Sequence, residues 1–163
     1  MSIYAPRVQQ LEIRKWLDKF NSKETVCVTL TYSKYWMNRI SRSIGFTYRE
    51  RLRAYLINHL DDYLHYLNKH YFGNAFRRFN KRLPIVPVIE GDNLVYDYHF
   101  HLGFLIPERI TLDDFRLEAR KKWRKGMVDV QQEPKGYWLN YITKLDTKDF
   151  DQPYTDSILY ECM

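Results

Sequence analysis

Cysteine, glycine and proline are all scarce in this chain of 163 residues. There are two cysteines, six glycines and six prolines. Two cysteines, Cys27 and Cys162, cannot build a disulfide scaffold, and they agree with a reducing compartment. The low glycine and proline content excludes collagen-like and low-complexity chains. Because 45% of the residues are hydrophobic, we expect one ordinary buried core.

Long hydrophobic runs are missing as well. No stretch approaches the roughly 18 uncharged residues needed to cross a bilayer, and the N-terminus has no apolar signal segment. We therefore expect a soluble, cytoplasmic protein that does not bind a membrane. The sequence also lacks the phosphate-binding pattern Gly-x-x-x-x-Gly-Lys-Ser/Thr. The chain therefore contains no recognisable nucleotide-driven motor.

Acidic residues are fewer than basic ones, and they are unevenly placed. The whole chain has 26 lysines and arginines against 20 acids, a net charge of +6. Residues 146–163 carry five of those acids and only one lysine. We therefore divide the chain into a basic domain at residues 1–145 and an acidic C-terminal tail at residues 146–163.

Two basic clusters stand out in the domain, and both are interleaved with aromatic residues. One comprises Arg77, Arg78, Lys81 and Arg82, and the other comprises Arg116, Arg120, Lys121, Lys122, Arg124 and Lys125. Cations mixed with aromatic rings suit phosphate contacts and base stacking. The alternative for either cluster is an ordinary solvated helix face. As the nucleic-acid contacts we select Arg77, Arg78, Lys81, Arg82, Arg120, Lys121 and Lys122.

Period-two and helical patterns alternate along the first half of the chain. Residues 11–20 predict a short helix, and residues 25–32 alternate as a strand, with apolar side chains on one face and small polar ones on the other. Residues 47–50 form a capping box that opens a long amphipathic helix. We expect this helix to cover one face of the sheet.

A hairpin and two further helices are predicted in the second half. Residues 84–90 and about 94–106 read as strands joined by the turn at residues 91–93. A helix capped at Thr111 should run to about Lys125. The pattern indicates an α/β (α+β) fold, in which a central, mainly antiparallel sheet carries helices on one face.

Two histidines and a glutamate make the predicted hairpin a candidate metal site. In a strand, His99 and His101 point to the same side while Phe100 faces the core. Glu90 ends the preceding strand, so the hairpin can bring its carboxylate to both imidazoles. Such a set suits Mn²⁺ or Mg²⁺, with Zn²⁺ as the alternative. The competing interpretation is a pair of hydrogen-bonded core histidines beside a surface glutamate.

A second motif follows Pro134, which suits the first turn of a helix. In a helix, Tyr137, Tyr141 and Lys144 lie at i, i+4 and i+7 along one stripe. A tyrosine of ordinary pKa, about 10, becomes a nucleophile only with help from a cation or base, and Lys144 can supply the charge. Without the histidines, this stripe would be an amphipathic helix face that packs on the core.

The remaining candidates are interpreted as structural. His59, His65 and His70 lie on the long helix at spacings that point them to different sides. Cys27 lies within a strand and has no partnered base in the sequence. We therefore assign no catalytic or metal-binding role to these residues.

Residues 25–145 resemble the HUH endonucleases, and within them the replication initiators of rolling-circle phages and plasmids. The resemblance rests on the strand at residues 26–31, on Glu90 followed by the His-hydrophobe-His at 99–101, and on the Tyr-x-x-x-Tyr-x-x-Lys at 137–144. Histidines before tyrosine is the initiator order in this family. The resemblance implies a ferredoxin-like, RRM-like sheet.

The resemblance also implies an activity: metal-dependent nicking and joining of single-stranded DNA at a replication origin, which can be a hairpin. It leaves a 5′-phosphotyrosine and a free 3′-hydroxyl. The implied roles are metal binding by His99, His101 and Glu90, attack by Tyr141, a second attack by Tyr137, and assistance by Lys144. Expected partners are a separate helicase and the polymerase of a bacterial host. The alternatives are a transposase of the same chemistry and a non-catalytic nucleic-acid-binding domain.

Overall fold

One antiparallel sheet organises the protein. The computed structural model describes residues 15, 18–20, 25–44, 49–91 and 98–132. Among them, four strands pair in the order β2-β3-β1-β4. Their bounds are β1 Thr25–Thr31, β2 Ile85–Glu90, β3 His99–Leu105 and β4 Val128–Gln132. Each neighbouring pair is antiparallel, so the predicted antiparallel sheet is confirmed.

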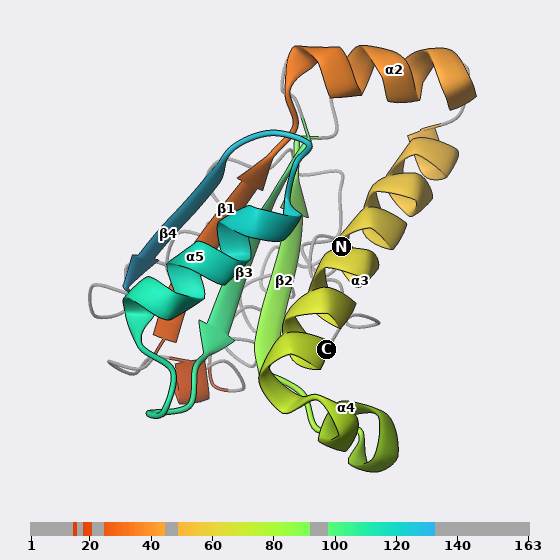
Figure 1. Ribbon diagram of the computed structural model, residues 1–163. Coiled ribbons are helices and arrows are strands. Elements are labelled where there is room, and N and C mark those ends of the chain that lie inside the picture. Colours follow the sequence, from red (N-terminus) through yellow and green to blue (C-terminus); the bar gives the residue numbers. More distant parts are fainter. Residues whose placement is uncertain (1–14, 16–17, 21–24, 45–48, 92–97, 133–163) are drawn as a thin grey trace, which may run out of the picture.

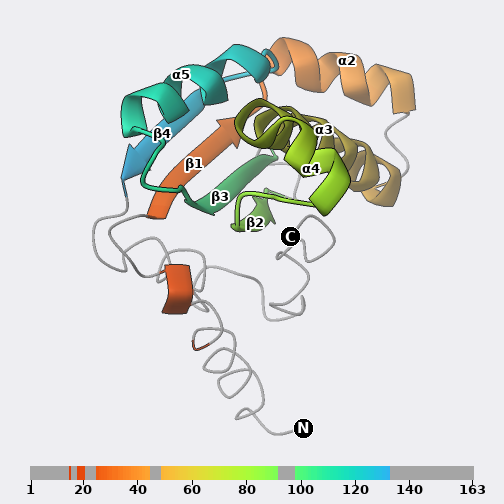
Figure 2. The same ribbon diagram turned by 60° about the horizontal axis from the view of Figure 1, so that its bottom comes forward.

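The longer helices all lie on one side of this sheet, as Figure 2 shows. They are α2 Lys34–Ile44, α3 Arg49–Phe72, α4 Asn74–Phe79 and α5 Leu112–Lys122, and a short 3₁₀ turn, η1, spans Asp18–Phe20. α3 and α5 lie across the strands, whereas α2 projects beyond the end of the sheet at which β1 finishes (Figure 1). The prediction of an α+β fold with helices on one face is confirmed. No helix among the described residues is long and apolar enough to span a bilayer.

The core lies between the sheet and the helices because every second strand residue is apolar. On β3 the inward residues Phe100, Leu102 and Phe104 are at most 1% exposed. They pack with buried residues of α3 and α5, including Leu60 and Phe115. Burying side chains of this size contributes roughly 1.5–3 kcal/mol each. On the central strands β1 and β3 the other face carries polar side chains such as Thr29 and His101, whereas on β2 it also carries the buried residues Val86 and Val88.

Some predicted boundaries differ from the observed ones. Thr111 caps α5 as expected, because its hydroxyl accepts a hydrogen bond from the amide of Asp114 at 3.2 Å. The prediction that this helix reaches Lys125 is wrong, because Trp123 turns to an extended backbone and ends it at Lys122. In the predicted 11–20 helix, the last residues form the 3₁₀ turn η1.

Several predictions concern residues beyond those described. The capping box at 47–50 is only partly covered, and α3 begins at Arg49. The turn at 91–93 is described only at Gly91, and the tyrosine helix at 137–144 lies wholly outside the described residues. The predicted hairpin itself is confirmed, since β2 pairs with β3 from Ile85 to Glu90.

Pro87 sits within β2, at the edge of the described sheet. Its Cα partner is Leu102. The amide of Leu105 donates to the Pro84 carbonyl at 3.0 Å, and hydrogen-bonded pairs alternate along an antiparallel ladder. Pro87 therefore occupies a position whose amide would point away from β3. A proline fits there without the loss of a ladder hydrogen bond.

Candidate metal centre

Glu90, His99 and His101 converge at one end of the β2–β3 hairpin. Glu90 and His99 are direct cross-strand partners, and His101 is two residues further along β3. The Nε2 atoms of His99 and His101 each lie 3.6 Å from Oε2 of Glu90. One ligand atom from each of the three residues falls within 4.8 Å of the others. The group could therefore hold a metal ion.

The strand period explains why these side chains meet. Successive residues of a strand point to opposite faces, so His99 and His101 share the face opposite to Phe100. Their rings lie with centroids 4.8 Å apart and planes at 90°. The pairing of Glu90 with His99 closes the nine-residue separation that the sequence shows between them. Strand pairing thus brings all three predicted ligands to one place.

Thr29 on β1 supports the inner histidine. It pairs with His101 across the sheet, and its Oγ1 lies 3.2 Å from Nδ1 of that ring. When Nδ1 carries the ring proton and donates a hydrogen bond to the threonine oxygen, Nε2 is unprotonated. Its lone pair, on the side of Glu90, is then available to a metal ion. Metal-binding histidines commonly use such a partner to fix the ring and its tautomer. Thr29 is the residue of this site that the sequence interpretation did not identify.

Burial is graded across the group. The side chain of His101 is 10% exposed, that of Glu90 19% and that of His99 26%. The inner imidazole is thus held within the protein, while the outer one remains accessible from solvent. Among the described residues the group offers two imidazoles and one carboxylate, a donor set that suits a divalent metal ion.

The chain was compared with protein-family models, curated proteins and solved structures. None of them matches.

The first basic cluster lies far from this group. Arg77 and Arg78 are exposed on α4, and Lys81 and Arg82 follow that helix. This segment precedes the start of β2, whereas Glu90 ends the strand, and Figure 1 shows α4 at the opposite end of the sheet. Roughly 17 Å of extended strand separates the two ends. A DNA strand touching both would have to run along the molecule.

The second basic cluster lies at the C-terminal end of α5, closer to the metal-binding end of the sheet. Directly after α5, Nε1 of Trp123 donates a hydrogen bond to the carbonyl of Thr31 at 2.9 Å. Thr31 in turn pairs with His99 across the sheet. Lys121 forms an ion pair with Glu118, and Lys122 lies over the Tyr66 ring at 5.3 Å. Lys122 therefore contacts α3 directly, whereas the ion pair of Lys121 lies within α5.

The histidines of α3 have structural surroundings, as expected from their spacing. Nδ1 of His59 lies 3.2 Å from the hydroxyl of Tyr32, and burial lowers the pKa of His59 to about 4. His65 packs edge-on against Phe76 at 4.9 Å, and Nδ1 of His70 lies 3.5 Å from Glu118. All three histidines therefore contact residues outside the group formed by Glu90, His99 and His101.

The Tyr-x-x-x-Tyr-x-x-Lys motif lies outside the described residues, so its catalytic role and its placement relative to the metal group stay predictions. This applies to Tyr137, Tyr141 and Lys144.

Proposed function

We propose that the protein is a metal-dependent nuclease that nicks and rejoins single-stranded DNA through a tyrosine, as HUH replication initiators do. The observation that carries this proposal is the convergence of Glu90, His99 and His101 within 4.8 Å at the end of one hairpin. The sequence supplies the second half, a Tyr-x-x-x-Tyr-x-x-Lys pattern at 137–144.

The topology supports the same proposal. Helices separate β1 from β2 and β3 from β4, and the sheet order is β2-β3-β1-β4. This is the arrangement of the β-α-β-β-α-β, ferredoxin-like motif, with additional helices between β1 and β2. The resemblance of the sequence implies this type of sheet, and the histidines occupy its central strand β3. We therefore assign the fold to the HUH type as part of the proposal.

In the proposed reaction, the phenol oxygen of Tyr141 attacks a phosphorus of the DNA backbone. A bond forms between that oxygen and phosphorus, the bond from phosphorus to the 3′ oxygen breaks, and the phenol proton passes to solvent water. The departing 3′ oxygen takes up a proton and becomes a free 3′-hydroxyl. Lys144 stabilises the phenolate that develops during attack. The step is a transesterification, so it needs no oxidant, reductant or nucleotide.

The metal-binding group would hold Mn²⁺ or Mg²⁺ through His99, His101 and Glu90. A bound divalent ion supplies Lewis-acid polarisation of a phosphate oxygen. Thr29 holds the His101 ring in place, and Glu90 provides the negative charge that hard cations favour. In this proposal, these residues would hold the cleaved phosphate beside His99, at the start of β3.

Two tyrosine nucleophiles would allow a second cleavage while the first DNA strand is still covalently attached. After Tyr141 becomes linked to the 5′ phosphate, Tyr137 can cut a second time, and the free 3′-hydroxyl can attack a phosphotyrosine to restore the phosphodiester. This cycle suits rolling-circle replication, with a separate helicase to unwind the duplex and a host polymerase to extend the 3′-hydroxyl.

The test is capture of the covalent intermediate. Purified protein is mixed with labelled circular phage single-stranded DNA or a panel of origin oligonucleotides and Mn²⁺, then run on a denaturing gel. We expect a labelled band of protein size that EDTA abolishes and that is lost in Tyr141→Phe. Tyr137→Phe, the matched control, retains the first covalent product.

Two outcomes would count against the proposal. If no covalent band forms on any DNA while binding persists, the protein is a non-catalytic nucleic-acid-binding domain. If Tyr141→Phe retains full nicking, the principal nucleophile is another residue.

A further inference from the structure

An aromatic and cationic surface on α2 is not among the predicted DNA contacts. Within α2, Tyr35, Arg39 and Arg42 lie at i, i+4 and i+7 and therefore along one stripe. All three side chains are exposed, Tyr35 by 68%. The helix contains three basic residues and no acidic one. An exposed ring beside two guanidinium groups is the combination that binds bases and phosphates of a single strand.

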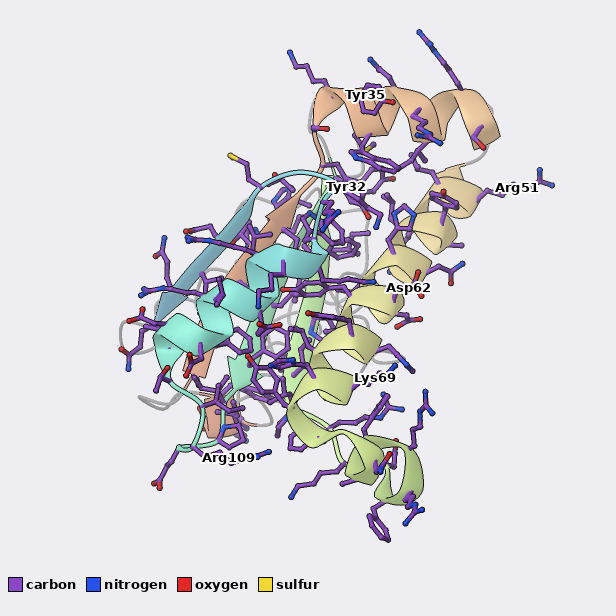
Figure 3. All side chains as sticks on the ribbon, in the orientation of Figure 1. Tyr32, Tyr35, Arg51, Asp62, Lys69 and Arg109 are labelled. Atoms are coloured by element: carbon purple, nitrogen blue, oxygen red, sulfur yellow. The ribbon has the colours of Figure 1, made fainter. Side chains whose placement is uncertain are left out.

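A pocket of about 490 Å³ lies beside this stripe, between α2, the end of β1 and the segment before β4. Tyr35 and Trp36 line it from the helix, and Arg124 and Lys125 line it from the other segment. Figure 3 shows Tyr35 on α2 and Tyr32 at the nearby end of β1, with Arg109 at the far end of the molecule. The volume falls within the usual range for small-ligand sites, roughly 300–1,000 Å³.

Trp36 holds the cations of the pocket in place. Its Nε1 donates to the backbone carbonyl of Arg124 at 3.2 Å. The guanidinium of Arg39 lies 5.3 Å from the centre of its ring, and the ammonium of Lys125 lies 5.9 Å from it. Lys125 also lies 5.3 Å from the ring of Trp123. Cation–π contacts of this kind order long side chains that would otherwise sample many rotamers.

The pocket is fixed to the metal-binding strand. Thr31 lines the pocket and is the direct cross-strand partner of the metal-site residue His99. A Cβ on Gly126 would lie 1.9 Å from the Thr31 carbonyl oxygen, so only glycine lets the two backbones approach this closely. Hydrogen bonds from Thr31 to Met127 at 3.0 Å and from Ser33 to Lys125 at 2.8 Å hold the junction.

We propose that this α2 pocket is a nucleotide subsite that holds single-stranded DNA next to the phosphate being cut. A base stacks on the exposed ring of Tyr35, and the flanking phosphates contact Arg39 and Arg124. The proposal rests on the nuclease function proposed above, because it gives the substrate strand a fixed path to His99. The α4 cluster, at the other end of the sheet, does not guide the strand to the cut.

Fluorescence anisotropy with labelled oligothymidylate in EDTA tests binding without cleavage. We expect Tyr35→Ala to weaken binding about 10-fold, since stacking on one ring contributes that much or more per base. The matched control is Phe79→Ala, which removes the 78% exposed ring of the basic α4 segment and should change affinity less than twofold. Circular dichroism checks that both variants fold.

A charge pair completes the test. Arg124→Ala keeps the backbone carbonyl that Trp36 uses and removes one cation, so the slope of log affinity against log salt should fall by about 0.7. Lys69→Ala, which removes an exposed cation of α3 that is not among the predicted contacts, should leave the slope unchanged. The subsite would be overturned if the two ring variants lost affinity equally, or if the two charge variants lowered the salt slope equally. Unchanged affinity in Tyr35→Ala would overturn it as well.

The covalent-capture assay separates the two proposals. If wild-type protein forms the covalent band but Tyr35→Ala binds oligothymidylate normally, the nuclease function stands and the subsite is wrong. If Tyr35→Ala loses affinity but no covalent band forms in wild type, the subsite stands as a DNA-binding surface and the nuclease function is wrong. Tighter binding of an oligouridylate of the same length would also overturn the assignment to DNA.

Discussion

The two faces of strand β3 differ in nearly every physical property. Toward the helices, Phe100, Leu102 and Phe104 are buried among apolar residues. Toward the opposite side, His99 and His101 meet the carboxylate of Glu90. One face supplies stability and the other supplies ligands, and the two sets interleave residue by residue. Because the functions alternate along the chain, single substitutions should separate them.

The largest effect is expected on the core face. Phe100→Ala removes a fully buried ring. The centre of this ring lies 6.2 Å from the ring centre of Trp123 and 6.3 Å from that of Tyr32. We expect the free energy of unfolding to fall by about 3–5 kcal/mol. Urea denaturation followed by circular dichroism measures this change. A loss below about 1 kcal/mol would show that the face is not tightly packed.

The ligand face should respond in function and not in stability. His99→Ala removes the more accessible imidazole, and we expect Mn²⁺ affinity to fall by about 100-fold, equivalent to about 2.7 kcal/mol. Calorimetric titration with Mn²⁺ measures the affinity. The unfolding midpoint without metal should stay close to that of wild type. His65→Ala, which alters an exposed histidine outside the group, is the control and should bind Mn²⁺ normally.

Thr29 tests how far the ligand face extends into the next strand. Thr29→Val removes the oxygen 3.2 Å from Nδ1 of His101 while it keeps a β-branched shape. We expect about 10-fold weaker Mn²⁺ binding, as is typical when such an outer partner is lost. Thr29→Ser keeps the hydroxyl and should restore most of the affinity. Equal affinities for the valine and serine variants would mean that the hydroxyl does not orient the ring.

The smallest effect concerns a histidine of the helical side. Burial first, and then the nearby charge of Lys125, lower the pKa of His59 from 6.5 to about 4. Protonation therefore favours the unfolded chain, so this contribution to stability is present above pH 6.5 and is lost as the pH falls toward 4. His59 is partly exposed, so solvent screening reduces the effect to about 1 kcal/mol.

Urea denaturation at pH 7 and pH 4.5 measures the contribution of His59. His59→Gln keeps a polar partner for Tyr32 and should show a smaller loss between the two pH values than wild type. An identical pH dependence in the variant would assign the loss to other groups. One of these is Glu118, whose pKa a hydrogen bond from Lys121 lowers.

The hairpin could be predicted because its signals are local. Alternation of His99, Phe100 and His101 fixes their faces, and a turn signal separates two apolar runs of strand length. The same reasoning identifies the polar side of β1. The strand that pairs with β1 cannot be read from the sequence pattern, since β1 and β3 are about 70 residues apart. The role of Thr29 therefore emerged only from the pairing of these strands.

Two elements of the fold, α2 and β4, were not predicted from the sequence. In α2 only Ile40 is fully buried among the described side chains, and in β4 only Val130 is. The strand β4 is short and mostly polar, so it shows almost no strand period. By contrast, α2 does carry apolar residues at helical spacing, since Trp36 and Met37 pack against the core beside Ile40, and its pattern could have been read from the sequence. The α2 pocket depends on the packing of such elements and on the close approach at Gly126. Surface sites of this type need three-dimensional information.

Pro87 has a consequence for the behaviour of the protein in concentrated solution. Among the described strands β2 stands at the edge of the sheet, and the proline leaves a gap in the row of amide donors on its outer side. An incoming strand would lose a hydrogen bond in the middle of a six-residue edge. The missing donor and the burial of β2 together make this edge of the described sheet a poor template for a strand of another molecule.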